Sequence, residues 1–237
     1  MLLSFIVPAY NEELELPETL AALDSAGTGA GVRYEIIVVD DSSTDTTAAI
    51  AEEAGARVLS VRRRQIAAAR NAGARAARGN VLFFVDADTR INSAHISGAL
   101  AALARGCVGG SARVRMDGEL PIWARIFVAG FCAVYFAANL GVGAFIFVRR
   151  DAFEAEGGFD EQYFAAEETY LSMALKRHGP FQILHEPVTT SARKIRMHSP
   201  TRVIAQMLFI IFGGKKSLRT REKLDLWYDG KREGRTA

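Results

Sequence analysis

The chain has 237 residues, of which 49% are hydrophobic and 24% are charged. This balance allows a packed core and excludes a disordered chain, and the length suits one large α/β domain or two small ones. Two cysteines, Cys107 and Cys132, are too few for a disulfide framework, so we interpret both as buried thiols in a reducing compartment.

Strand and helix patterns alternate through the first hundred residues. The first apolar run meets Pro8 and an acidic stretch and has no basic leader, so it reads as a buried strand and not as a signal sequence. A flexible turn is expected at 27–31. The apolar and β-branched runs that we expect to be strands are Leu3–Val7, Glu35–Asp40, Arg57–Val61 and Val81–Val85. The expected helices are Leu14–Leu23, Asp45–Ala54, Ile66–Ala77 and Ser93–Ala104. This alternation predicts a parallel sheet with right-handed crossovers.

The second half is less regular. We expect strands at Gly109–Met116 and Ala144–Val148, and helices at Ile122–Ala138, Glu167–His178 and Pro200–Phe212. The uncharged run 126–148 has the length of a membrane-spanning helix, but Asn139 and three glycines favour a helix, a turn and a core strand.

Aromatic side chains recur at helical spacing in this region, and core packing is the expected use of such a stripe. The stripe consists of Trp123, Phe127, Phe131 and Tyr135. With Phe136 and the apolar run 203–212, any surplus of apolar surface would suit a lipid-linked acceptor, a membrane surface or a dimer contact.

Charge is distributed unevenly along the chain. The formal net charge is +2, but residues 193–237 hold twelve Lys and Arg against four Asp and Glu, a local +8, which leaves −6 on residues 1–192. A basic C-terminal end fits either an anionic lipid surface or a solvated tail. We therefore expect a cytoplasmic protein with peripheral contact to the inner membrane face. No nucleic acid is expected, because no recognition motif accompanies the charge.

Acidic residues follow three of the first four predicted strands, at 8–12, 40–45 and 86–88. Ligands of parallel α/β sheets bind beyond the carboxyl ends of the strands, where clustered carboxylates need a cation or a hydrogen-bond network. The spacing of Asp86 and Asp88 lets two carboxylates reach one space from a turn. Such oxygen ligands select Mg²⁺ or Mn²⁺, and a metal held by few protein ligands can also bind a diphosphate.

The order of the motifs resembles that of the family 2 glycosyltransferases, which have the GT-A fold. The resemblance covers about residues 3–192 and rests on Val7–Glu12, Val38–Asp45, Ala69–Gly73, Phe84–Asp88, Gly143–Phe153 and Gly157–Glu161. It implies an α/β fold with a Rossmann-like, mostly parallel, twisted sheet flanked by helices and a smaller mixed acceptor-side portion. We expect a glycosyltransferase domain at 1–199, with a donor half to about 105 and an acceptor half from 106. An apolar helix and a basic tail follow at 200–237.

The resemblance also implies residue roles. Asp88, supported by Asp86, would hold the metal on the diphosphate of a UDP- or GDP-sugar. Glu168, in preference to Glu167, would be the general base that takes the proton of an acceptor hydroxyl, and the product would be inverted. The residues implied in donor binding are Pro8, Ala9, Tyr10, Glu12, Asp40, Asp41, Arg70, Asp86 and Arg193.

The sequence departs from the family pattern near these positions. Glu replaces the usual Asp at 168, and no third metal ligand is evident, with His185 and His198 as nearby candidates. Arg193 and Lys194 are the alternative contacts for the diphosphate. The run 62–64 is expected to be a solvated loop, with a lining of the donor cleft as the alternative.

Two other functions compete with sugar transfer. A nucleotidyltransferase also uses acids on an α/β sheet, but it usually has a Gly-rich basic loop after the first strand, where this chain has Ala9–Glu13. A non-catalytic nucleotide-sugar-binding module would keep the nucleotide site and lack turnover, and the altered acidic pair at 167–168 leaves that hypothesis open.

Overall fold

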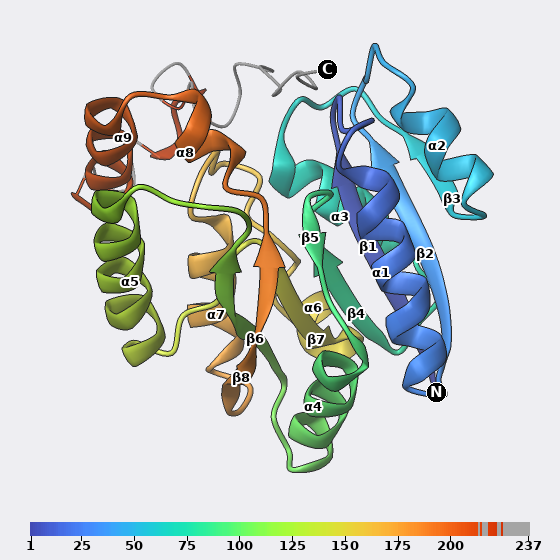
Figure 1. The fold of residues 1–237 in the computed structure, drawn as a ribbon. Coiled ribbons are helices and arrows are strands. Elements are labelled where there is room, and N and C mark those ends of the chain that lie inside the picture. Colours follow the sequence, from blue (N-terminus) through green and yellow to red (C-terminus); the bar gives the residue numbers. More distant parts are fainter. Residues whose placement is uncertain (213, 215–217, 222–223, 225–237) are drawn as a thin grey trace.

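An eight-stranded sheet with helices on both faces forms the centre of the protein in the computed structural model, which describes residues 1–212, 214, 218–221 and 224 (Figure 1). The strands are β1 (Leu2–Ala9), β2 (Arg33–Asp40), β3 (Arg57–Ser60), β4 (Val81–Val85), β5 (Thr89–Arg90), β6 (Gly109–Met116), β7 (Phe145–Arg149) and β8 (Phe181–Thr190). The helices are α1 (Leu16–Gly29), α2 (Thr47–Glu53), α3 (Ile66–Ala76), α4 (Ser93–Ala104), α5 (Ile122–Ala137), α6 (Arg150–Ala155), α7 (Glu167–Leu175), α8 (Arg193–Met197) and α9 (Pro200–Phe212). This arrangement confirms the predicted α/β fold.

The strand order β3-β2-β1-β4-β7-β6-β8-β5 joins the two halves of the chain into one sheet. Strands β3, β2, β1 and β4 are parallel, as expected for consecutive β-α units. Strand β7 runs antiparallel to both β4 and β6, and β6 runs parallel to β8. The sheet is therefore mixed in its second half, and β7 joins the two halves by pairing with β4 on one side and β6 on the other.

Alternating side chains of the central strands feed two cores, one on each face of the sheet. In β1, Phe5 and Val7 join the core that α1 and α4 cover, whereas Ile6 joins the core that α3, α6 and α7 cover. All three side chains are fully buried. Burial on both faces explains why the strands read as unbroken apolar runs.

Close contact between α3 and the sheet fixes two positions of the Ala69–Gly73 motif. A Cβ on Gly73 would lie 2.4 Å from Ile6 Cγ2 and 2.9 Å from Val39 Cγ2, so only glycine permits this approach. Asn71 donates to the carbonyl of Phe159 at 2.8 Å and accepts from its N–H at 2.9 Å. The motif thus anchors the second half of the chain on the first half.

Most predicted elements agree with the structure within a few residues, and the strand Val81–Val85 and the helix Pro200–Phe212 have the predicted bounds. The turn predicted at 27–31 is limited to residues 30 and 31, because α1 continues through Gly29. The predicted core packing of the aromatic stripe is also wrong: the stripe is half-buried, and Ala124 is the one buried residue of α5. Cys107 is buried as predicted, but Cys132 is only half-buried. Strands β5 and β8 and helices α6 and α8 are elements that the sequence did not predict.

Candidate active site

The sheet topology brings the three acidic strand ends together. Strands β2, β1 and β4 are neighbours, and Ala9 at the end of β1 pairs with Asp40 at the end of β2. The backbone N–H of Asp41 donates to the carbonyl of Ala9 at 2.9 Å. The loops 8–12, 40–45 and 86–88 therefore leave the sheet along one edge, as the sequence predicted.

Asp40 and Asp41 organise the loops that follow β2 and β3 at this edge. The buried Asp41 carboxylate accepts the backbone N–H groups of Arg63 at 2.7 Å and Gln65 at 3.0 Å. Asp40 accepts the N–H of Ser43 at 3.2 Å. These bonds hold the start of α3 against the end of β2.

Arg64 lies beside Tyr10 and not in open solvent. Its guanidinium carbon sits 3.3 Å from the centroid of the Tyr10 ring, which is a cation–π contact. The predicted solvated loop at 62–64 is therefore wrong for Arg64, which packs against the first-strand loop. An arginine run directly before α3, next to an acidic strand end, was the sequence signal for this contact.

Arg193 connects the start of α8 to the first-strand loop and to Asp88. It donates to both carboxylate oxygens of Glu12, at 2.6 and 2.7 Å, and pairs with Asp88 at 3.1 Å. Burial alone would lower the pKa of Arg193, but the Glu12 and Asp88 carboxylates raise it above its ordinary value. The Thr190 hydroxyl donates to the other oxygen of Asp88 at 3.3 Å. No sequence signal predicts the role of Thr190, which lies 102 residues from its partner.

Arg70 joins the end of β4 to the start of α7. It is only 2% exposed, and its guanidinium pairs with Asp86 at 2.7 Å and with Glu167 at 2.9 Å, and donates to the carbonyl of Gly143 at 2.9 Å. Although burial alone would lower its pKa, the two carboxylates raise it. One buried cation therefore balances acids from β4 and α7, which is the arrangement in which buried charge is tolerated.

The two acids at the start of α7 have different surroundings. Glu167 is buried and paired with Arg70. Glu168 is half-buried beside Gly143, and a Cβ added to Gly143 would lie 3.8 Å from the Glu168 carboxyl carbon. Burial, together with the Glu167 carboxylate, raises the pKa of Glu168 to about 8. A carboxyl group whose pKa lies near neutral pH is suited to proton transfer.

Backbone strain gathers around these loops. Four non-glycine residues with positive φ border the site: Asn11 (52°), Ser42 (67°), Arg64 (51°) and Ala166 (62°). Each neighbours a residue named above, and Ala166 directly precedes Glu167. Strain of this kind costs about 1–3 kcal/mol per residue and clusters where function requires a fixed loop geometry.

Comparison with protein families identifies the family of this chain. A family model described as glycosyl transferase family 2 matches residues 4–157, which is more than half of the chain. The chain belongs to glycosyl transferase family 2.

Similar curated proteins cover less than half of the chain. The undecaprenyl-phosphate 4-deoxy-4-formamido-L-arabinose transferase of Pseudomonas paraeruginosa (strain DSM 24068 / PA7) is 39% identical over 94 residues, which are 37% of this chain and 28% of that protein. The dolichyl-phosphate β-glucosyltransferase of Drosophila melanogaster is 43% identical over 99 residues, 36% of this chain and 30% of that protein. These two matches thus span less than a third of each relative's own length.

A solved structure supports the fold over nearly the whole chain. The mannosyltransferase PcManGT of Pyrobaculum calidifontis, in complex with GDP-Man and Mn²⁺, superposes with a TM-score of 0.69 at 21% identity. The alignment covers 96% of this chain and 73% of that one. At 21% identity the similarity shows that this family 2 glycosyltransferase and the mannosyltransferase share the GT-A fold.

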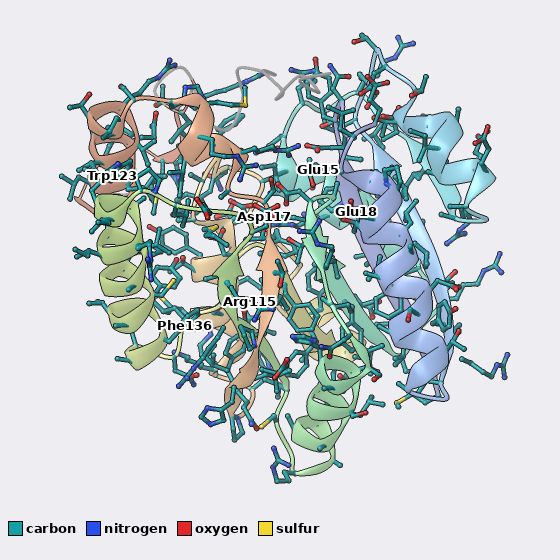
Figure 2. All side chains as sticks on the ribbon, in the orientation of Figure 1. Glu15, Glu18, Arg115, Asp117, Trp123 and Phe136 are labelled. Atoms are coloured by element: carbon teal, nitrogen blue, oxygen red, sulfur yellow. The ribbon has the colours of Figure 1, made fainter. Side chains whose placement is uncertain are left out.

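Further acids lie near the carboxyl ends of β6 and β8 (Figure 2). Glu15 accepts the Ser191 hydroxyl at 3.2 Å, and Asp117 accepts the N–H of Ala192 at 2.7 Å. Burial raises the pKa of Glu15. These bonds hold the segment between β8 and α8, which carries Arg193, in place beside the donor loops.

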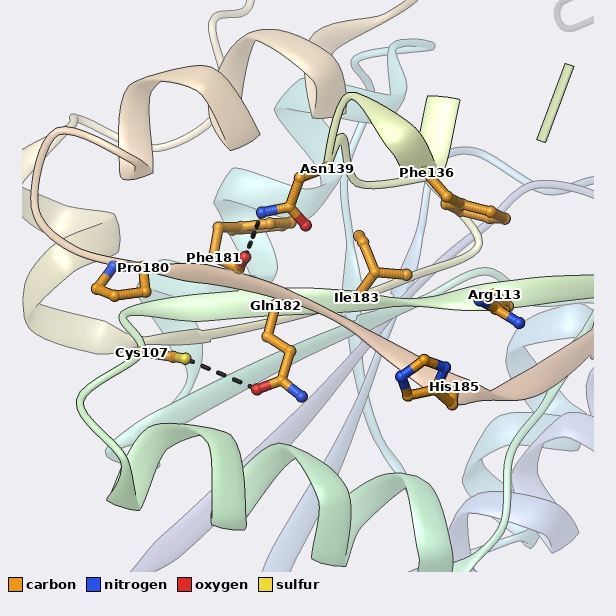
Figure 3. A pocket seen from close by; sticks show the side chains of 9 residues that line it. All are labelled: Cys107, Arg113, Phe136, Asn139, Pro180, Phe181, Gln182, Ile183 and His185. Carbon is orange, nitrogen blue, oxygen red and sulfur yellow. Dashed lines mark hydrogen bonds between the residues drawn. The ribbon is translucent and has the colours of Figure 1, made fainter. Parts of the chain in front are cut away.

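A separate pocket of about 460 Å³ lies near the starts of β6 and β8 (Figure 3). Its lining includes His185, Arg113 and Phe136, and Cys107 contacts Gln182 at 3.8 Å. None of the predicted catalytic or donor-binding residues lines it, and neither does Asp86 or Asp88. His185, a predicted candidate for the third metal ligand, lies in this pocket and not with the acids. In the part of the chain that the structure describes, no helix has both the length and the apolar character to cross a membrane.

Proposed function

We propose that this family 2 glycosyltransferase is a metal-dependent, inverting enzyme that transfers a sugar from a UDP- or GDP-sugar to an acceptor hydroxyl carried by a lipid. One observation carries the proposal: buried Arg70 ties donor-side Asp86 to acceptor-side Glu167, so the proposed diphosphate site and the proposed base, Glu168, are held beside each other. The GDP-Man complex of the structural neighbour supports a nucleotide-sugar donor. The names of the curated relatives support a lipid-linked acceptor.

The donor would lie along the edge formed by β2, β1 and β4. In this proposal the first-strand loop, from Pro8 and Ala9 to Tyr10 and Glu12, contacts the nucleoside together with Asp40 and Asp41. The fixed loop geometry and the Arg64–Tyr10 contact support a preformed site. Arg70 acts indirectly, because its guanidinium is already bound to Asp86, Glu167 and Gly143.

The carboxylates of Asp86 and Asp88 fit a Mg²⁺ or Mn²⁺ ion of the type that completes its shell with water and phosphate oxygens. No group of three or more ligating side chains occurs among the described residues, so a complete protein cage is not available there. Both carboxylates are paired with arginines, Asp86 with Arg70 and Asp88 with Arg193. When bound, the ion would neutralise charge on the departing diphosphate.

Glu168 would take the proton of the acceptor hydroxyl as that oxygen attacks the anomeric carbon. The new carbon–oxygen bond forms on the face opposite the diphosphate, the old one breaks, and the nucleoside diphosphate leaves. Because Arg70 engages Glu167, Glu168 is the better candidate for the base. Arg193 and half-buried Lys194 supply positive charge near Asp88, and burial lowers the pKa of Lys194.

A lipid phosphate is the second candidate acceptor, and two observations favour it. The names of both curated relatives include a polyprenyl or dolichyl phosphate. A phosphate oxygen is already ionised and needs no base, whereas a Glu168 carboxyl with a pKa of about 8 is largely protonated at neutral pH.

The substitution Glu168→Gln tests the function and separates the two acceptors. With a hydroxyl acceptor, loss of the base is expected to lower kcat by about 10²–10⁴-fold while nucleoside diphosphate affinity is kept. With a phosphate acceptor, kcat is expected to fall by less than about tenfold. Turnover is measured as nucleoside diphosphate release with Mn²⁺ present. The absence of turnover with every donor, combined with retained nucleotide binding, would contradict the enzyme and support a binding module.

A further inference from the structure

Helix α5 is apolar on every face, yet it is not buried. Arg125 is the one charged residue in Ile122–Ala137, and Ala124 is the one buried residue. A helix that is hydrophobic all round normally lies inside a protein or against lipid. The described part of the chain does not cover α5, so its exposed face requires another explanation.

The exposed side chains of α5 form one continuous face. Ile122, Ile126 and Val134 are 74%, 70% and 73% exposed, and the other exposed positions are alanine or glycine apart from Arg125. Of the seven large apolar side chains exposed in the described residues, four lie on α5 and α9, the fourth being Leu208. Figure 1 shows both helices on the same side of the molecule. We call this surface the α5–α9 face.

Basic charge accompanies the α5–α9 face. Arg125 and Arg202, both exposed, are the charged residues within the two helices, and α8, which leads into α9, adds the exposed Arg196, which also pairs with Asp117. Residues 193–237 have a net charge of +8. A second copy packed on this face would bring like charges together, whereas anionic lipid headgroups complement them.

We propose that the α5–α9 face docks on the surface of an anionic lipid bilayer, with α5 lying in the plane of the interface. Over the residues that the structure describes, neither helix has the length to cross the bilayer. Trp123 lies at one end of α5 (Figure 2), and tryptophan is favoured at the level of lipid headgroups. Apolar area with adjoining positive charge is the signature of an interfacial helix.

The inner side of α5 connects this face to the candidate active site. The Tyr135 hydroxyl contacts the Thr169 hydroxyl, next to Glu168, and burial together with the Glu168 carboxylate raises the pKa of Tyr135. Helix α9 packs Phe209 and Ile210 against the cluster of Tyr163 and Ala165, just before α7. A lipid-borne acceptor would therefore reach Glu168 from the docked face; this last step rests on the proposed function.

Vesicle flotation of the full chain tests the docking. Wild type is expected to float with vesicles of phosphatidylcholine plus phosphatidylglycerol, less with phosphatidylcholine alone, and less at high salt. Ile126→Glu is expected to lower the bound fraction about tenfold, since one buried aliphatic side chain is lost and a repelled charge is gained. Met173→Glu, at a 53% exposed position on α7, is the matched control and is expected to stay within about twofold of wild type.

Two further measurements make the result decisive. Melting temperatures show that the variants fold, and Ile122→Glu repeats the test at a second exposed position. The proposal is overturned if wild type does not bind anionic vesicles, if Ile126→Glu binds as wild type does, or if Ile126→Glu instead dissociates a wild-type dimer in gel filtration. Donor turnover in solution is scored separately, so that vesicle binding without turnover contradicts the proposed function and leaves the docking intact.

Discussion

At the residue scale, Glu168 couples the chemistry of the site to protein stability. Its folded-state pKa, about 8, lies above the ordinary 4.5, so the folded protein holds a proton that the unfolded chain has lost between these values. Stability from this group is fully present below pH 4.5 and is lost as the pH rises through 8. The site therefore destabilises the protein under the conditions in which Glu168 is ionised.

Glu168→Gln removes this ionisation while it keeps the shape of the side chain. We expect the melting temperature of the variant to match wild type near pH 4.5 and to exceed it increasingly toward pH 9, by about 2–4 °C for each kcal/mol recovered. Differential scanning calorimetry across this pH range measures the difference. Glu53→Gln, at an exposed position of α2, is the control and should follow wild type at every pH. A constant offset for Glu168→Gln would contradict the raised pKa.

At the element scale, local patterns predicted the central strands well because β1, β4 and β7 are largely buried on both faces, whereas the partly buried β8 was not predicted. The failed turn prediction at 27–29 has a physical cause: glycines usually mark turns, but here Gly27 lies within α1. A Cβ there would lie 2.5 Å from the Tyr34 ring, so the glycine allows the helix to lie against β2. Short-range propensity does not include this tertiary contact.

Two helical glycines predict opposite responses to the same substitution. Gly73→Ala should destabilise the protein by about 1–3 kcal/mol, because its Cβ would overlap Ile6 and Val39 in the core. Gly130→Ala should stabilise it by about 0.5–1 kcal/mol, because no atom lies within 4 Å of the added Cβ and alanine favours a helix. Urea unfolding with unchanged m-values measures both. If both substitutions changed the free energy of unfolding in the same direction, α3 would not contact the sheet as closely as the structure shows.

At the scale of the whole molecule, the sequence predicted the acidic edge but not what balances its charge. Residue order along parallel strands was enough to place Asp40, Asp41, Asp86 and Asp88 at one edge. The counter-charges come from α3 and α8, and Arg193 meets Glu12 across 181 residues of sequence. Such pairing depends on the mixed second half of the sheet, where β7 reverses direction, and no local pattern encodes it.

The pairing of the acidic edge with Arg70 and Arg193 predicts how the molecule responds to ligands. A nucleoside diphosphate with Mn²⁺ binds the folded state alone, so it should stabilise the protein by about 2.7 kcal/mol at a hundredfold excess over Kd. If Asp88 holds the metal, the ion replaces Arg193 as its partner. Asp88→Asn should then remove the Mn²⁺-dependent part of the stabilisation and keep the weaker metal-free part, whereas Asp41→Asn should reduce both parts.

Thermal unfolding of the variants, with and without nucleotide and Mn²⁺, separates these effects. Asp151→Asn alters an exposed carboxylate that pairs with Arg149 away from the site, so it should respond to ligand as wild type does. If Asp88→Asn kept the full Mn²⁺-dependent stabilisation, residues other than Asp88 would hold the metal. A protein that no nucleoside diphosphate stabilises would have its acidic edge neutralised by Arg70 and Arg193 alone, and the edge would then serve stability and not sugar transfer.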